Sequence, residues 1–210
     1  MNVLSIDFDI IMAPDIGLYN PLIRAGSEEK NVTLKKLCED FPMLNNCRAD
    51  LNHYQKIVNF LVNNIKHLNP QDIRVSFTHE DIKHLLNGLS NVNMFSIDHH
   101  HDLGYVNPED DVEENIPCTC ANWGDFFLRD KTITHFTWLK NTNSSEHPIY
   151  SKDSRITTFN LSDYDLNDIP KIDKLFLCLS PEWTSEAFFP LFYLILDLIN
   201  GQKNCHLEMH

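Results

Sequence analysis

Apolar runs of strand length alternate along this chain with segments of helical periodicity. We expect strands at residues 3–11, 73–77, 92–97, 132–139, 156–161 and 174–179, and helices at 51–68, 81–89, 122–128 and 185–200. This alternation is typical of an α/β protein with a mostly parallel central sheet flanked by helices. Because a chain of 210 residues can bury one large core, we expect a single domain over residues 1–210.

Four of the expected strands end in polar residues, and this coincidence says most about function. The clusters are Asp7 with Asp9, Thr78-His79-Glu80, Asp98 to Asp102, and Ser180 to Trp183. In parallel α/β sheets, ligands bind beyond the carboxyl ends of the strands. The sequence therefore predicts a polar site at one edge of the sheet.

The segment Asp98-His99-His100-His101-Asp102 places two carboxylates and three imidazoles directly after an apolar strand. Carboxylate oxygens and imidazole nitrogens suit Mn²⁺, Fe²⁺ or Zn²⁺, and the lack of a thiolate disfavours a structural zinc site. In an extended backbone, Asp98, His100 and Asp102 would share one face, with His99 and His101 on the other. The alternative is a solvated histidine-rich turn, which we disfavour because burying such groups without partners is costly.

Asp7 and Asp9 interrupt an otherwise apolar run, and strand alternation would put them on the same side. Two carboxylates this close repel each other and need a cation or a shared proton, unless the strand lies at an edge and both face water. His79 ends an expected strand one helix and one strand before Asp98. It is either a third contributor to the site or a capping histidine.

Glu182 follows Pro181 at the end of a strongly apolar strand. It could hold a cationic substrate, or it could be an acid at a helix N-terminus that the helix dipole favours. Trp123 and Trp183 are candidates for the wall of a substrate pocket, although packing in the core is the commoner role of tryptophan.

The charge balance limits the partners of the chain. Lys and Arg total 17 against 30 Asp and Glu, a net charge of −13, which argues against binding to nucleic acid or to an anionic membrane. No apolar run is long enough to span a bilayer, and the N-terminal residues do not resemble a signal peptide. With six cysteines and no export signal, we expect reduced thiols and a cytoplasmic location. The sequence leaves the oligomeric state open.

Asp98-His99-His100-His101-Asp102 resembles the D-x-H-x-D motif of the ureohydrolases, the arginase family and its histone-deacetylase-like relatives. The resemblance implies an arginase-like fold and two Mn²⁺ ions. The implied metal ligands are Asp98, His100 and Asp102 of this motif, His79 in Thr-His, and Asp7 and Asp9 in Ser-Ile-Asp-Phe-Asp. The chain departs from the arginases in three ways: its D-x-D pair precedes the D-x-H-x-D motif, glycines are absent before the upstream histidine, and the chain is short.

Three segments together are similar to those of small atypical arginases. They are the D-x-H-x-D segment, the Asn-Trp pair ending at Trp123 and the Ser-Pro-Glu-Trp segment ending at Trp183. Those proteins convert arginine to ornithine inside ribosomally made peptides. The resemblance implies hydrolysis of the arginine guanidinium to ornithine and urea by a hydroxide that bridges the metals, with an arginine-containing precursor peptide as partner. Asp102 would orient the hydroxide, and Glu182, or in reserve Glu80, would hold the guanidinium. His99 or His101 would pass a proton to the leaving amine.

Three other interpretations remain at this point. The order Asp7-Phe8-Asp9 and then Asp98-His99-His100 also resembles the D-x-D and D-H-H motifs of manganese phosphoesterases, but gives Asp102 no role. A haloacid-dehalogenase-like phosphatase would use Asp7 as nucleophile and Asp9 as acid/base, and it leaves residues 98–102 unexplained. A non-catalytic protein could use the same cluster to store a metal or to bind a basic partner.

Overall fold

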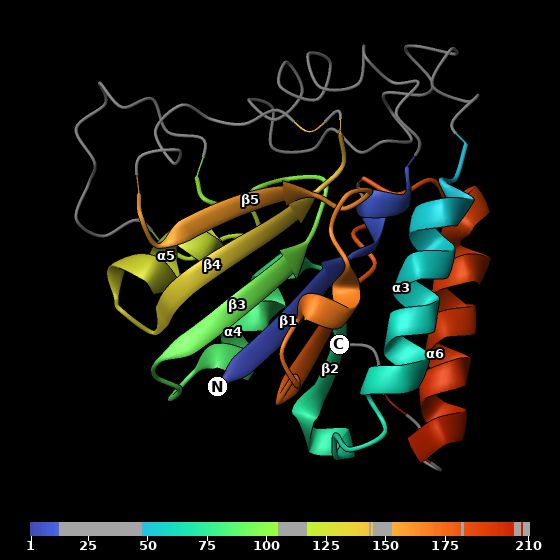
Figure 1. Ribbon diagram of the computed structural model, residues 1–210, viewed down its shortest axis with the longest axis horizontal. Helices are drawn as coiled ribbons and strands as arrows, with labels where there is room; N and C mark the ends of the chain where they lie inside the picture. The colour runs from blue at the N-terminus through green and yellow to red at the C-terminus, as the bar shows by residue number, and fades with distance from the viewer. Residues whose placement is uncertain are drawn as a thin grey trace.

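The computed structural model describes residues 1–12, 48–104, 117–142, 144, 153–181, 183–203 and 207. Six strands in this part of the chain form one sheet with the order β2-β6-β1-β3-β4-β5, and every neighbouring pair is parallel (Figure 1). The strands are β1 (Asn2–Asp7), β2 (Ile73–Ser76), β3 (Val92–Ile97), β4 (Ile133–Lys140), β5 (Ile156–Asn160) and β6 (Lys174–Cys178). The α/β class and the parallel sheet predicted from the sequence are confirmed.

Helices cover both faces of the sheet. One face carries α3 (Leu51–Asn64) and α6 (Phe189–Lys203), which lie side by side in Figure 1, and the other carries α4 (Ile82–Leu86) and α5 (Trp123–Arg129). A parallel sheet covered in this way needs apolar side chains on both faces. In the sequence, the strands are therefore nearly continuous runs of apolar residues.

Strand β1 lies in the middle of the sheet and shows this double burial. Leu4 and Ile6 are part of the core under α3 and α6, whereas Val3 belongs to the core under α4 and α5. Because side chains alternate along a strand, Ser5 and Asp7 share the α4/α5 side with Val3. The two polar residues of the strand thus point to the same face.

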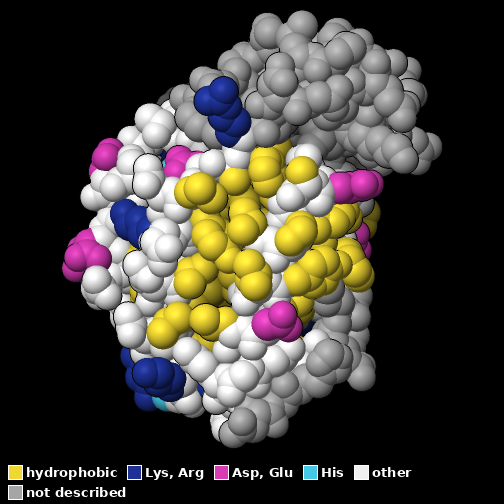
Figure 2. Space-filling model, turned by 90° about the vertical axis from the view of Figure 1, so that its right-hand side faces the viewer, with side chains coloured by type: hydrophobic (Ala, Val, Ile, Leu, Met, Phe, Trp, Pro, Cys, Tyr) yellow, Lys and Arg dark blue, Asp and Glu magenta, His cyan; other side chains and the backbone are white. Residues whose placement is uncertain are grey.

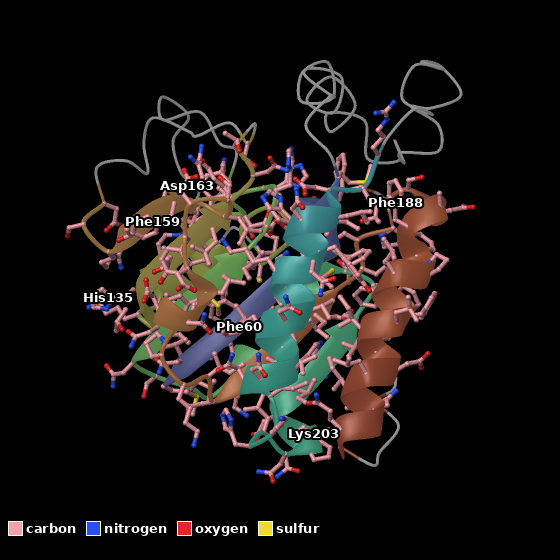
Figure 3. All side chains as sticks on the ribbon, turned by 45° about the vertical axis from the view of Figure 1, so that its right-hand side comes forward. Phe60, His135, Phe159, Asp163, Phe188 and Lys203 are labelled. Carbon is pink, nitrogen blue, oxygen red and sulfur yellow. The ribbon has the colours of Figure 1, made fainter. Side chains whose placement is uncertain are left out.

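Polar contacts fix both ends of α3. The Asp50 carboxylate accepts hydrogen bonds from the backbone N–H groups of Asn52 and His53, which caps the N-terminus. At the other end, Lys203, labelled at the foot of α6 in Figure 3, donates to the carbonyl groups of Ile65 and Leu68. This lysine joins the two helices of the layer.

The outer surface of the α3/α6 layer is rich in apolar side chains (Figure 2). On α6, Leu194 is 57% exposed and Tyr193 43% exposed, while the neighbouring Ile195 is buried in the core. The helix is therefore apolar on its inner and its outer side. No helix in the described part of the chain is both long and apolar enough to cross a membrane.

The first strand is shorter than the sequence predicts. The apolar run continues to Ile11, but β1 ends at Asp7 and residues Phe8–Ile11 form a turn of 3₁₀ helix. Asp7 begins this turn, and its Oδ1 lies 3.4 Å from the backbone N of Asp9. Asp9 is therefore on the turn rather than in the strand, so strand alternation does not explain why it lies near Asp7.

Candidate metal centre

Four neighbouring strands bring the polar clusters to one edge of the sheet. In the order β2-β6-β1-β3, each strand ends at or just before one of the clusters singled out in the sequence. The acidic pair of β1 comes first in the chain, yet β1 pairs directly with β3, in a register that places Ile6 opposite Ile97. The position of the D-x-D pair along the chain is thus no obstacle to one shared site.

His79 lies at the centre of a first group of ligand atoms. Its Nδ1 is 3.1 Å from Oδ2 of Asp7, 3.2 Å from Oδ2 of Asp98 and 3.0 Å from Oδ2 of Asp102. All four side chains are buried. Asp7, His79 and Asp98 form one of the two described sets whose atoms could hold a metal ion.

His100 and Asp9 form a second group beside the first. His100 Nδ1 lies 2.8 Å from Oδ2 of Asp9, and these two residues together with Asp98 offer ligand atoms within 4.8 Å of one another. Asp98 belongs to both groups. We call the six residues together the carboxylate–histidine cage: Asp7, Asp9, His79, Asp98, His100 and Asp102. All six were predicted from the sequence.

The hydrogen bonding of the cage is incomplete, and this is the test of whether a cation fits. Among the described residues, four buried cage atoms have no hydrogen-bond partner of good geometry: Asp9 Oδ2, His79 Nδ1, Asp98 Oδ2 and His100 Nε2. Leaving such atoms unsatisfied in a buried site is costly. Three carboxylate oxygens around one imidazole nitrogen match the donor set that divalent cations prefer. The residues present therefore fit a metal ion.

The backbone after β3 is not extended, contrary to the assumption made from the sequence. Asp102 has a positive φ of 48°, and the Asp98 carboxylate accepts a hydrogen bond from the backbone N of His100 over 2.8 Å. The carbonyl oxygen of Asp102 accepts from the backbone N of Gly124 over 2.9 Å. A Cβ at position 124 would lie 3.0 Å from that oxygen, so a larger residue there would require the Asp102 backbone to shift. The bend still directs Asp98, His100 and Asp102 into one cage.

Side chains around the cage orient its members. Ser5 Oγ lies 2.7 Å from His79 Nε2, which leaves Nδ1 of that ring for the cage. The Trp123 indole donates to Oδ2 of Asp102 over 2.7 Å. The Trp138 indole donates to the backbone carbonyl of Asp98 over 2.9 Å. Of these contacts, those of Ser5 and Trp123 reach the ligand side chains themselves and so fix the orientation of metal ligands.

The sequence reasoning did not include Ser5, and it placed Ser180 in the polar cluster after β6 without assigning it a contact with the cage. Ser180 Oγ donates to Oδ2 of Asp7 over 2.6 Å. A signal for Ser5 was present, because a serine in an apolar strand two residues before an aspartate shares its face. For Ser180 the signal was its place at the start of the polar cluster after β6, but its contact with Asp7 depends on a backbone conformation that the sequence does not reveal.

The electrostatics of the cage differ from one member to the next. Burial alone would lower the pKa of His79, but the carboxylates of Asp102, Asp7 and Asp98 hold it well above its usual value. Burial and repulsion by the neighbouring carboxylates raise the pKa of Asp98 well above its usual value. Burial alone would raise the pKa of Asp102, but contacts with His79 and Trp123 lower it overall. The raised pKa values of His79 and Asp98 favour their protonated forms, so a cation bound in the cage would compete with those protons.

The remaining two histidines of the 98–102 segment lie outside the cage. His99 is half-buried, with its Nδ1 3.5 Å from Ser144 Oγ, and burial lowers its pKa to about 4. His101 is buried, its Nδ1 accepts from the backbone N of Leu103 over 3.1 Å, and its ring packs edge-on against Trp138.

The candidate substrate-binding residues differ in their burial and contacts, as far as the structure describes them. Glu182 lies outside the described residues. Trp183, next to it, places its ring 5.4 Å from that of His100. Glu80 forms an ion pair with Lys83, and its side chain is 38% exposed. Trp123 is completely buried, so its indole holds Asp102 and does not line an open surface.

The chain was compared with models of protein families, with curated proteins and with solved structures. None of the three comparisons finds a match.

Proposed function

We propose that this protein is a binuclear metal hydrolase of the arginase type. Its substrate would be an arginine side chain in a peptide, which it hydrolyses to ornithine and urea. One observation carries the proposal: two imidazole nitrogens and four carboxylates meet in one buried cage, with His79 Nδ1 within 3.2 Å of three carboxylate oxygens and no aligned hydrogen bond. The resemblance of the motifs to the ureohydrolases adds the reaction.

The ligand sets support two cations. His79, Asp7, Asp98 and Asp102 would hold the first, and His100, Asp9 and Asp98 the second. Four carboxylates carry a formal charge of −4, which two divalent ions balance. Oxygen and imidazole ligands without thiolate favour Mn²⁺. The ions would lower the pKa of a water molecule and so supply the nucleophile near pH 7.

The chain's own residues would orient and bind the substrate. His100 is the most exposed member of the cage, with 19% of its side chain exposed, so the substrate would approach from its side. Strand β6 lies between β2 and β1 in the sheet, and Glu182 follows it in the sequence, so its carboxylate is the candidate that would bind a guanidinium. Trp183, beside His100, offers an aromatic ring to the same cation.

Two candidates were named for proton transfer to the leaving amine, and the geometry favours His99. His99 is less buried than His101 and lies next to His100, with the two rings 5.1 Å apart. Because burial lowers the pKa of His99 to about 4, it is neutral near pH 7 and would take a proton from the attacking water before passing it on. His101 is buried, and its Nδ1 already accepts a backbone hydrogen bond. Asp102, held by Trp123, is the carboxylate that would orient the nucleophile.

The cage favours the arginase interpretation over the D-H-H phosphoesterase. His100 and Asp102 contribute to the cage, and Asp102 has no role in the phosphoesterase interpretation. His99, the first histidine of the D-H-H pattern, faces Ser144 instead. In the ion pairs of the described residues, no lysine or arginine contacts a cage carboxylate, although a phosphate substrate would need such cations.

Urea release tests the proposal. The protein loaded with Mn²⁺ would be incubated with free arginine and with a panel of arginine-containing peptides, each with and without a chelator. We expect urea from peptides, abolished by the chelator. Urea from free arginine as well would indicate a general arginase. Hydrolysis of a generic phosphodiester without release of urea would contradict the proposal and support the phosphoesterase interpretation.

A further inference from the structure

Ser180 has a backbone conformation that its side chain disfavours. It lies two residues beyond the end of β6, is buried, and has a positive φ of 45°. Outside glycine, this left-handed region is disfavoured, and asparagine and aspartate are the usual exceptions. A buried serine held in this region indicates that its surroundings require the conformation.

The hydroxyl of Ser180 fixes one oxygen of the cage. Its Oγ donates to Oδ2 of Asp7 over 2.6 Å, and this same oxygen lies 3.1 Å from Nδ1 of His79. On its other side, Oγ is 3.1 Å from Sγ of Cys178. Since Oδ1 of Asp7 faces the backbone N of Asp9, both oxygens of this carboxylate are held in place.

The backbone of Ser180 begins the turn on the substrate side. Its carbonyl oxygen accepts from the backbone N of Trp183 and from that of Thr184, each over 2.9 Å. The Thr184 hydroxyl donates to the carbonyl of Leu179 over 2.8 Å, which closes the turn. This turn places the Trp183 ring beside His100.

We propose that Ser180 is a positioning residue that joins the metal ligand Asp7 to the turn expected to contact the substrate. Because Ser180 has a positive φ, its hydroxyl points to Asp7 and its carbonyl oxygen accepts hydrogen bonds from the turn that carries Trp183. The inference rests on the proposed function for the presence of a metal at the cage, and it gives a role to the serine of the Ser-Pro-Glu-Trp segment, to which the resemblance assigns none. It does not depend on which substrate is hydrolysed.

Two substitutions separate the hydroxyl from the backbone conformation. Ser180→Ala removes the hydroxyl and keeps the disfavoured φ, whereas Ser180→Gly removes the hydroxyl and relieves the strain. Thr184→Val is the matched control, because it removes a buried hydroxyl of the same turn that donates to a main-chain carbonyl rather than to a cage residue. Mn²⁺ affinity and stoichiometry would be measured by calorimetry on the full chain, with thermal unfolding of each metal-free variant.

We expect both Ser180 variants to bind Mn²⁺ about tenfold or more weakly than the wild type. Thr184→Val should stay within about twofold, and Ser180→Gly should unfold at a higher temperature than Ser180→Ala. Wild-type affinity in Ser180→Gly would overturn the inference, because the backbone alone would then suffice. An equal loss in Thr184→Val would also overturn it, because any damage to the turn would then have the same effect.

The same experiment separates this inference from the proposed function. If the wild type binds Mn²⁺, releases no urea, and loses affinity in both Ser180 variants, the positioning role stands and the arginase reaction is wrong. If the wild type releases urea and all variants bind Mn²⁺ equally, the reaction stands and the positioning role is wrong. A wild type that binds no Mn²⁺ would overturn both.

Discussion

The indole N–H of Trp123 donates to the carboxylate of Asp102 over 2.7 Å, and both side chains are buried. The accepting oxygen is the one that lies 3.0 Å from His79 Nδ1. A tryptophan that looks like part of the core therefore fixes a cage oxygen. This contact leads to the first prediction.

Trp123→Phe should weaken Mn²⁺ binding about tenfold, because the donor that orients Asp102 is lost. Trp138→Phe is the matched control: it also removes a buried indole N–H, but one that donates to the backbone carbonyl of Asp98 rather than to a carboxylate. Calorimetric titration with Mn²⁺ measures both. Equal losses of affinity in the two variants would contradict a specific role for the Asp102 contact.

Asp98→Asn should abolish binding of both ions, because Asp98 belongs to both groups of ligands. His100→Ala should lose only the second ion and keep about one Mn²⁺ per chain. Elemental analysis of protein freed from excess metal gives the stoichiometry. Two ions retained by Asp98→Asn would show that the cage is assigned wrongly.

The same Asp98→Asn variant should be more stable than the wild type when both are metal-free. Burial and the neighbouring carboxylates raise the pKa of Asp98, so its charged form destabilises the folded state. We expect the Tm at pH 8 to rise by a few degrees, which corresponds to about 1 kcal/mol for a chain of this size. A lower Tm in the metal-free variant would contradict the prediction.

The stability of the metal-free protein should fall as the pH rises above about 6.5. The folded-state pKa of His79 is raised above the ordinary value of 6.5, so its stabilisation is complete below that value and disappears as the pH rises through the higher folded pKa. The raised pKa of Asp98 acts in the same direction. Unfolding in urea between pH 6 and 9 measures the slope, and saturating Mn²⁺ should flatten it. A metal-free protein whose stability rises over this range would contradict the assignment.

Glu182→Gln should keep both metal ions and lose most urea release from arginine peptides, because a neutral amide cannot balance the guanidinium charge. Glu80→Gln is the control, since the Glu80 carboxylate already pairs with Lys83 at the surface. Steady-state urea assays with metal analysis measure both. Full activity in Glu182→Gln would show that Glu182 does not bind the guanidinium. Loss of activity in Glu80→Gln would assign that role to Glu80 instead.

Much of the fold could be predicted, because the sheet is buried on both faces. The apolar runs of β3 and β6 stand out from their polar flanks, and the expected ranges agree with the structure within one residue. Strand β1 was predicted too long because Ile10 and Ile11 are also buried, although they lie on a 3₁₀ turn. Burial, and not strand conformation, produced that apolar pattern.

The six cage residues could be predicted because they are titratable groups next to apolar strands, and such a position is costly without a cation. The orienting contacts could not. Trp123 was considered for a pocket wall because a sequence does not tell whether an indole near a site faces solvent or a carboxylate. The conformations of Asp102 and Ser180, both with positive φ, depend on the whole assembled edge of the sheet.

The place of β1 between β3 and β6 has a consequence for how the protein is made. Asn2 hydrogen-bonds to Asp173, 171 residues away, and β1 pairs along its length with β6. On the ribosome, the second edge of β1 therefore stays uncovered until a segment 171 residues further along the chain has emerged. Such long-range parallel pairing folds slowly. Because β6 lies between β2 and β1 in the sheet, His79 after β2 is positioned beside Asp7 only once β6 is in place, so the cage forms late in folding.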